Sequence, residues 1–196
     1  MDDTKQMEKR TRASDIGIEV LSPENLAVYV NRIQSFDCDY EGINIALRNA
    51  HTQDVTTILA VNTVNGDIMG FCSYCCASLK VGDTVYPAIE GKSFGVDIKY
   101  QDYYLQLDGT HNADAPLCAA YLFGYFFSHL DMISRTYVCA RYFVFNSRRK
   151  NDVVKFYKKC GCMNFGSSAL GKPLMVRERG EEISDYFMFR EFPKII

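Results

Sequence analysis

Eight cysteines are the first side chains whose type and spacing could support chemistry. Cys72 and Cys75 have the C-x-x-C spacing of zinc sites, but the surrounding residues 71–76 are typical of a strand. Residues three apart in a strand face opposite sides of a sheet, so these two thiols are not expected to meet at one metal. None of the three histidines stands within a few residues of a cysteine pair. We predict no metal site and no disulfide, with the cysteines reduced and packed as small apolar side chains.

Tyr157 lies in a short amphipathic segment, 151–160, that ends at Gly161. Its phenol carries one transferable proton with an intrinsic pKa of about 10, so it is protonated at neutral pH. A role in proton transfer and a role in packing the segment on a sheet are both open. Basic residues surround it, and they either contact phosphates or form the solvated side of a helix: Arg148, Arg149, Lys150, Lys155, Lys158 and Lys159.

The composition is that of a folded chain with one substantial core, since 47% of its 196 residues are apolar and 23% are charged. The formal net charge of −2 argues against a chain-wide nucleic-acid or membrane coat, but it is compatible with a local basic patch. No run reaches the roughly 18 apolar residues that span a bilayer, and the polar N-terminus lacks the apolar stretch of a secretory signal. We expect a cytoplasmic protein with no membrane contact, a loosely held tail over residues 1–15 and a single domain over 16–196.

Local signals predict helices and an antiparallel meander in the first half of the chain. Asn65-Gly66 is a strong hairpin-turn signal. Ser22 is a suitable helix N-cap, and Pro23 suits the first helical position. The elements expected here are a strand at 16–21, helices beginning after Ser22 and after Cys38, and strands at 56–62, 67–80 and 86–97.

The second half begins with a polar, irregular stretch at 98–115. Pro116 then opens a helix that is apolar almost all round, so we expect it to be packed on most sides. The elements expected are a helix at 116–133, a strand at 136–146, a helix at 151–160 and strands at 162–165 and 185–192. The whole pattern predicts an α/β (α+β) fold with a mixed, mostly antiparallel central sheet flanked by helices.

Over residues 16–192 this order of elements resembles the GNAT N-acetyltransferase superfamily. Val153-Val-Lys-Phe-Tyr-Lys-Lys-Cys-Gly-Cys-Met-Asn-Phe165 is similar to the family's F-Y-E-K-x-G-F pattern. The resemblance implies that Tyr157 protonates the departing CoA thiolate as a general acid.

A second motif, Ser93-Phe-Gly-Val-Asp97-Ile-Lys-Tyr-Gln101, is similar to the family's L-x-V-D-x-x-Y-Q stretch, where a strand splays open and pairs with the pantetheine arm of acetyl-CoA. The resemblance implies a catalytic carboxylate at Glu90, whose alternative is a surface Glu beside Gly91. For the motif itself the alternative is an ordinary core strand with a solvent-facing Asp97. The cofactor-binding residues that the resemblance implies are Phe94, Gly95, Val96 and Gln101.

Phe36-Asp-Cys38, followed by Ile43-Asn-Ile-Ala-Leu47, is similar to the F-x-C opening of the GNAT toxins that acetylate the amino group of charged tRNA. Asp67-Ile-Met-Gly-Phe-Cys-Ser-Tyr74 is similar to the strand that follows in those proteins. This resemblance implies a small-molecule or aminoacyl-tRNA amine as acceptor, and an antitoxin or a second copy of the chain as partner.

The chain departs from the family where a Gly-rich loop and a helix N-terminus should hold the CoA pyrophosphate with backbone N–H groups. Gln101 is followed by Asp102-Tyr-Tyr-Leu-Gln-Leu, with no glycine before Gly109. Asp108 and Asp114 add charges that oppose a pyrophosphate, and Pro116 has no N–H to offer. We therefore predict weak or absent acetyl-CoA binding, with the 102–115 segment partly occupying the pyrophosphate site.

Two functions follow from these observations. The leading interpretation is an N-acyltransferase that moves an acetyl group from acetyl-CoA to an amine, which the Phe156-Tyr157 pair favours. The alternative is a catalytically inactive GNAT-fold binding module that has lost acetyl-CoA binding, which the sequence after Gln101 favours.

Overall fold

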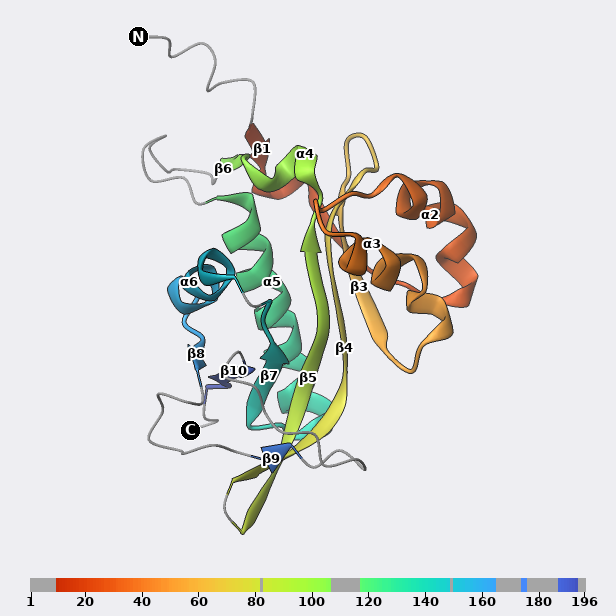
Figure 1. The fold of residues 1–196 in the computed structure, drawn as a ribbon. Helices are drawn as coiled ribbons and strands as arrows, with labels where there is room; N and C mark the ends of the chain where they lie inside the picture. The colour runs from red at the N-terminus through yellow and green to blue at the C-terminus, as the bar shows by residue number, and fades with distance from the viewer. Residues whose placement is uncertain are drawn as a thin grey trace, which may run out of the picture. The chain divides into compact units, whose positions relative to one another are not determined.

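The computed structural model describes residues 10–81, 83–106, 117–148, 150–164, 174–175 and 187–193 (Figure 1). The fold is mixed α+β, and its mostly antiparallel sheet has the strand order β2-β3-β4-β5-β7-β10-β8, with β9 paired to β4. The predicted fold class is therefore confirmed. The strands of this sheet are β2 (Ile16–Val20), β3 (Thr56–Asn62), β4 (Ile68–Val81), β5 (Thr84–Val96), β7 (Tyr142–Asn146), β8 (Met163–Asn164), β9 (Leu174–Met175) and β10 (Phe187–Glu191).

Helices and short helical turns connect the strands. They are η1 (Ala13–Asp15), α2 (Pro23–Ser35), α3 (Glu41–Arg48), η2 (Ala50–Thr52), α4 (Ile98–Gln101), α5 (Cys118–Ile133), the π-helical turn η4 (Ser134–Val138) and α6 (Asn151–Lys159). Within the described part of the chain, none of the helices has both the length and the hydropathy needed to span a bilayer. Contacts group the chain into two compact units: unit 1 comprises Met1–Ser73 and Ser93–Tyr125, and unit 2 comprises Tyr74–Lys92 and Phe126–Ile196.

In unit 1, helices α2 and α3 pack against β3 and β4 (Figure 1). The α2 start is fixed locally, because Asn25 Oδ1 accepts a hydrogen bond from the Ser22 N–H at 2.8 Å and Pro23 opens the helix. The hairpin predicted at Asn65-Gly66 is also present, since Gly66 adopts a φ of +76° that favours glycine. The core of this layer consists of Tyr29, Ile33, Phe36, Leu47, Leu59, Val61, Ile68 and Phe71.

Two stretches of unit 1 differ from the sequence prediction. Residues 10–15, expected as part of a loose tail, form η1 and the strand β1 (Arg10–Arg12), which pairs in parallel with β6 (Tyr104–Gln106). The supposedly irregular stretch after Asp97 contains both β6 and α4. The α4 turn forms because the Asp97 side chain accepts a hydrogen bond from the Lys99 N–H at 2.9 Å, which caps it.

In unit 2, β7 pairs in parallel with β5 and antiparallel with β10. The strand predicted from residue 136 begins only at Tyr142, because α5 continues into η4 and ends at Cys139, whose φ is 49°. The hydroxyl of Ser134 donates to the Ala140 carbonyl at 2.6 Å and closes this helix end. The core on one face of this sheet consists of Leu79, Ala88, Tyr142, Val144, Phe187 and Phe189.

Candidate functional site

The parallel pairing of β5 with β7 ends part-way along β5. The register runs from Ala88–Tyr142 to Gly91–Phe145, whereas β5 itself continues to Val96. The paired residues of β5, 88–91, belong with β7 to unit 2, and the ladder between them ends at Gly91–Phe145.

The two candidate catalytic residues lie on opposite faces of this β5–β7 ladder. Phe145 is paired with Gly91, and the Tyr157 ring lies 4.6 Å from the Phe145 ring, so Tyr157 covers the Gly91 face. Glu90 is paired with Val144, and neighbouring residues of a strand point to opposite sides of the sheet. Glu90 therefore points away from the face that Tyr157 covers.

Tyr157 is buried, with 9% of its surface exposed, and its aromatic neighbours are Phe145 and Phe156. Its backbone carbonyl accepts a hydrogen bond from the Cys162 N–H at 3.0 Å, after α6 ends and Gly161 turns the chain with a φ of +81°. The predicted helix and its glycine stop are thus confirmed. Proton donation by Tyr157 stays a prediction.

Glu90 is buried to 4% exposure, so the alternative of a surface Glu is wrong. Its Oε2 forms an ion pair with the Lys92 Nζ at 2.8 Å, and the Cys75 Sγ lies 4.0 Å from the same oxygen. Lys92 stands two residues along β5 and so shares the face of Glu90. The ammonium offsets the cost of burying the carboxylate. Sequence analysis did not identify Lys92 as part of this site, although the i, i+2 spacing of opposite charges in a strand could have indicated it.

The predicted cofactor-binding strand residues are closely packed by unit 1. The Phe94 and Phe123 rings meet edge to face with centroids 5.4 Å apart. At Gly95, an added Cβ would lie 2.7 Å from the Ile43 Cγ2, so the core leaves no room for a side chain there. Binding of pantetheine by Phe94, Gly95 and Val96 stays a prediction.

Gln101, also predicted to bind the cofactor, has its side-chain amide engaged within the protein. Its Nε2 donates to the Val96 carbonyl at 2.9 Å and to the Cys38 carbonyl at 3.3 Å. These bonds tie the end of β5 and the α2–α3 loop to α4. The contacts assign Gln101 a structural role, and its cofactor role is untested.

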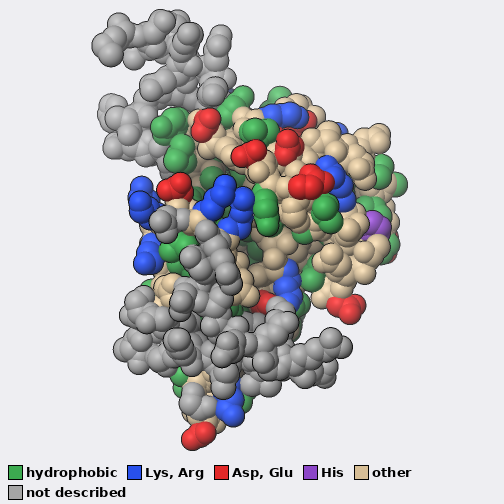
Figure 2. All heavy atoms as spheres, in the orientation of Figure 1, with side chains coloured by type: hydrophobic (Ala, Val, Ile, Leu, Met, Phe, Trp, Pro, Cys, Tyr) green, Lys and Arg blue, Asp and Glu red, His purple; other side chains and the backbone are tan. Residues whose placement is uncertain are grey.

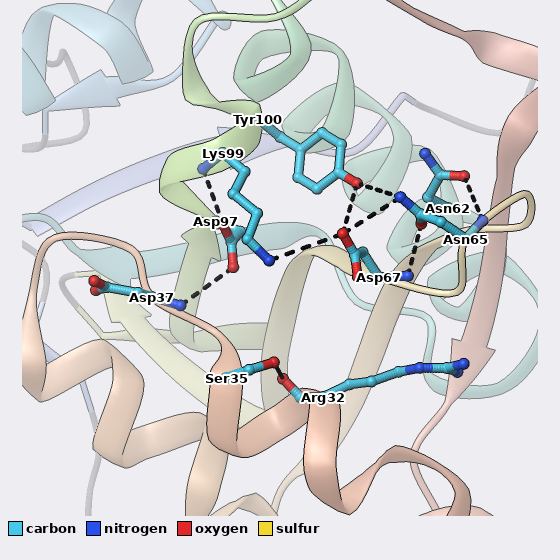
Figure 3. A network of polar contacts seen from close by, with 9 residues as sticks. All are labelled: Arg32, Ser35, Asp37, Asn62, Asn65, Asp67, Asp97, Lys99 and Tyr100. Atoms are coloured by element: carbon cyan, nitrogen blue, oxygen red, sulfur yellow. Dashed lines mark hydrogen bonds and ion pairs between the residues drawn. The ribbon is translucent and has the colours of Figure 1, made fainter.

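Asp97 is buried to 3% exposure, so the alternative of a solvent-facing Asp97 is wrong. Besides capping α4, its carboxylate accepts a hydrogen bond from the Asp37 N–H at 3.2 Å (Figure 3). The Ile98 N–H donates in return to the Asp37 carbonyl at 2.6 Å. Asp97 thus fastens the Phe36-Asp-Cys38 loop to the end of β5.

Figure 3 also shows a polar cluster at the β3–β4 hairpin that sequence analysis missed. The Tyr100 hydroxyl donates to Asp67 Oδ2 at 3.2 Å, and Asn65 Nδ2 donates to the same hydroxyl at 3.3 Å. Burial raises the pKa of Tyr100 above that of a free phenol. The Tyr of the V-D-x-x-Y-Q motif therefore anchors the hairpin turn.

The N-terminus of α5 has one backbone donor already used. The Cys118 N–H donates to the Tyr103 carbonyl at 2.8 Å, and Tyr104 forms a β-bridge with Leu117. Residues 103–104 therefore lie against the start of α5, where the resemblance predicts the pyrophosphate site. The predicted features at Asp108, Gly109, Asp114 and Pro116 lie outside the described residues.

Charged side chains are mixed over the visible described surface, with Lys and Arg beside Asp and Glu (Figure 2). The basic residues of and before α6 that are exposed are Lys150, Lys155, Lys158 and Lys159. Arg148 is half-buried, and Arg149 lies outside the described residues.

The cysteines are free thiols, and within the described residues no group of three or more His, Cys, Asp or Glu side chains is arranged to hold a metal ion. Cys72 is buried and Cys75 is half-buried. Burial raises the pKa of three thiols to about 12: Cys72, Cys118 and Cys162.

No protein-family model matches the chain, and no curated protein matches it. Solved structures do match. A mutant of the toxin AtaT bound to the C-terminus of the antitoxin AtaR is 14% identical, with a TM-score of 0.59 over 91% of this chain and 94% of that one. AtaTR bound with AcCoA is 16% identical, with a TM-score of 0.61 over the same shares. A bacterial toxin is 15% identical, with a TM-score of 0.63 over 90% of each chain. At such identities the likeness establishes the fold: the chain has the GNAT fold of these toxins.

Proposed function

We propose that the chain is an N-acyltransferase that moves an acetyl group from acetyl-CoA to an amine. The observation that carries the proposal is the end of the β5–β7 ladder at Gly91–Phe145, with Tyr157 on one face and Glu90 on the other. The chain shares its fold with AtaTR bound with AcCoA, and this likeness supports the acyltransferase proposal over the inactive binding module.

The residues at the ladder end fit the thioester end of acetyl-CoA, which supplies the acetyl group. Glu90 accepts the proton that the attacking amine gives up, and its ion pair with Lys92 keeps the carboxylate in one place. Tyr157 provides the proton that the departing CoA thiolate takes up. The pyrophosphate end is less well provided for, because Tyr103 already accepts the Cys118 N–H. We therefore expect weak acetyl-CoA binding.

For the acceptor we propose an amine carried on an anionic molecule such as a charged tRNA, rather than a small free amine. The exposed lysines of α6 support this choice, because they attract phosphates. We also propose an antitoxin partner and a cytoplasmic location, on the support of the toxin–antitoxin complex among the similar structures.

Calorimetry with acetyl-CoA and mass spectrometry of acetylated aminoacyl-tRNA test the proposal. We expect acetylation by the wild-type chain. Acetyl-CoA should bind about 10²-fold more weakly than a low-micromolar ligand, because the charges of Asp108 and Asp114 in the sequence oppose a pyrophosphate and N–H contacts are lost, each at about 1 kcal/mol. Tyr157→Phe should lower turnover by about 10²-fold. Tyr137→Phe is the matched control, because Tyr137 is 80% exposed on η4. A wild-type chain that acetylates neither aminoacyl-tRNA nor small amines is a binding module instead.

A further inference from the structure

The last turn of α6 sets the position of Tyr157. Three backbone hydrogen bonds of 3.0 Å close this turn: Cys160 N–H to Phe156, Gly161 N–H to Lys158 and Cys162 N–H to Tyr157. A helix end whose carbonyls have partners is held more firmly than one that frays into water. The position of the phenol therefore depends on what contacts this end of the helix.

Arg190 of β10 is the side chain that binds there. Its Nη1 donates to the Cys160 carbonyl at 3.1 Å, so a cation lies at the negative end of the helix. The same guanidinium lies 3.8 Å above the centre of the Phe127 ring of α5. One side chain thus joins α6, α5 and β10, and a planar guanidinium can stack and donate at once whereas an ammonium cannot do both equally well.

Arg190 and the Tyr157 ring are both positioned by strand β7. Arg190 is paired with Phe143 across the β10–β7 ladder, and Phe143 lies two residues before Phe145 on the same face. Phe145 is the ring against which Tyr157 packs. Arg190 therefore fixes the backbone of α6 to the strand pair that also holds the phenol ring.

We propose that Arg190 is a positioning residue for Tyr157. By binding the Cys160 carbonyl it holds the end of α6, so that the Tyr157 phenol keeps one orientation over Phe145. The catalytic consequence rests on the proposed function, but the anchoring itself does not.

Hydrogen exchange of the full chain tests the anchoring. In Arg190→Gln the amides of Cys160, Gly161 and Cys162 should exchange about 10-fold faster, which corresponds to the loss of one hydrogen bond to a charged group. Arg190→Lys should restore part of the protection. Arg141→Gln is the matched control, because Arg141 also lies over aromatic rings and pairs with Glu191 but has no contact with α6 among those described. Unchanged exchange in Arg190→Gln overturns the proposal.

Kinetics test the consequence for catalysis. Arg190→Gln should lower kcat by about 10-fold, because it removes the same single hydrogen bond to the Cys160 carbonyl. The KM for acetyl-CoA should stay within about twofold of the wild-type value. In the Tyr157→Phe background the same substitution should have no further effect on kcat, because residues that act through one another are not additive. An additive loss contradicts positioning through Tyr157. If the wild-type chain shows no turnover while exchange responds to Arg190→Gln, the proposed function fails and the anchor remains.

Discussion

Replacing Gly95 by alanine distinguishes two explanations for a glycine at this position: tight packing of the core and close approach of a ligand to β5. A Cβ built there would lie 2.7 Å from Ile43 Cγ2, 2.9 Å from Phe71 Cε1 and 3.4 Å from Phe36 Cζ. Carbon atoms in favourable contact are about 3.5–4.0 Å apart, so the first two contacts are overlaps. The neighbours are buried rings and a helix side chain that cannot all withdraw at no cost. Packing within unit 1 thus requires glycine whether or not a ligand approaches β5.

The expected cost follows from these overlaps. Overpacking a core costs about 1–3 kcal/mol, and replacing glycine by alanine recovers about 0.4–1 kcal/mol by restricting the unfolded chain. The difference between these ranges is a net loss of unfolding free energy between about 0 and 2.6 kcal/mol, and the two contacts under 3.0 Å place Gly95→Ala at about 1–2 kcal/mol within it. For a chain of this length that corresponds to a decrease in Tm of about 2–8 °C.

Thermal unfolding followed by circular dichroism measures this shift, and calorimetry with acetyl-CoA accompanies it. Gly124→Ala is the matched control, since a Cβ on Gly124 in α5 has nothing within 4 Å, and it should gain up to about 1 kcal/mol. Adding Ile43→Ala to Gly95→Ala should relieve the overlap and recover part of the loss. If Gly95→Ala is as stable as the wild type but loses acetyl-CoA binding, close approach of a ligand is the reason for the glycine and the packing argument is refuted.

Three further outcomes are expected. Lys92→Met should destabilise the fold by about 2–3 kcal/mol in urea unfolding, because it removes the ion pair of the buried Glu90 carboxylate. Glu90→Gln in the same chain should recover much of this loss, and a Lys92→Met variant as stable as the wild type would contradict the ion pair. Burial lowers the pKa of His129, so the folded state takes up a proton less readily than the unfolded state. The free energy of unfolding should therefore fall as pH decreases below about 6.5, and His129→Gln should reduce that pH dependence in a series of unfolding curves. A thiol reagent at mildly alkaline pH should modify the exposed thiols well before the buried ones, and peptide mass spectrometry should identify the fast group as Cys76 and Cys139 and the slow group as Cys72, Cys118 and Cys162.

Much of the fold was predictable because its signals are local. Ser22-Pro23 marks the start of α2, Asn65-Gly66 the β3–β4 turn and Gly161 the end of α6, and each signal depends only on the backbone preferences of adjacent residues. The start of β7 was wrong by six residues, 136 against 142, because β-forming residues in 134–138 are held in a π-helical turn by the Ser134–Ala140 hydrogen bond. That closure depends on packing at the end of α5, which local propensity does not include.

The candidate site was predictable only as a set of residues. The sequence indicated Tyr157, Glu90 and the strand that contains Gly95, but not their burial. A charged residue in a strand is expected at the surface by default. Glu90 is buried because Lys92 forms an ion pair with its carboxylate, and Asp97 is buried because backbone N–H groups of Asp37 and Lys99 donate to its carboxylate. Asp37 lies on the α2–α3 loop, 60 residues from Asp97 in the sequence, whereas Lys92 and Lys99 each stand two residues from the carboxylate that they contact.

The β4–β5 hairpin has a consequence for how the chain folds. Its two strands are joined by residues 82–83 only, so closing this connection costs little chain entropy and its pairing can begin early. Unit 1 takes the first part of β4 and the last part of β5, and unit 2 takes the rest of both strands. Neither unit is therefore a continuous piece of chain, so no single gene fragment encodes one of them, and cuts at the boundaries 73/74 and 92/93 would divide both strands of the hairpin.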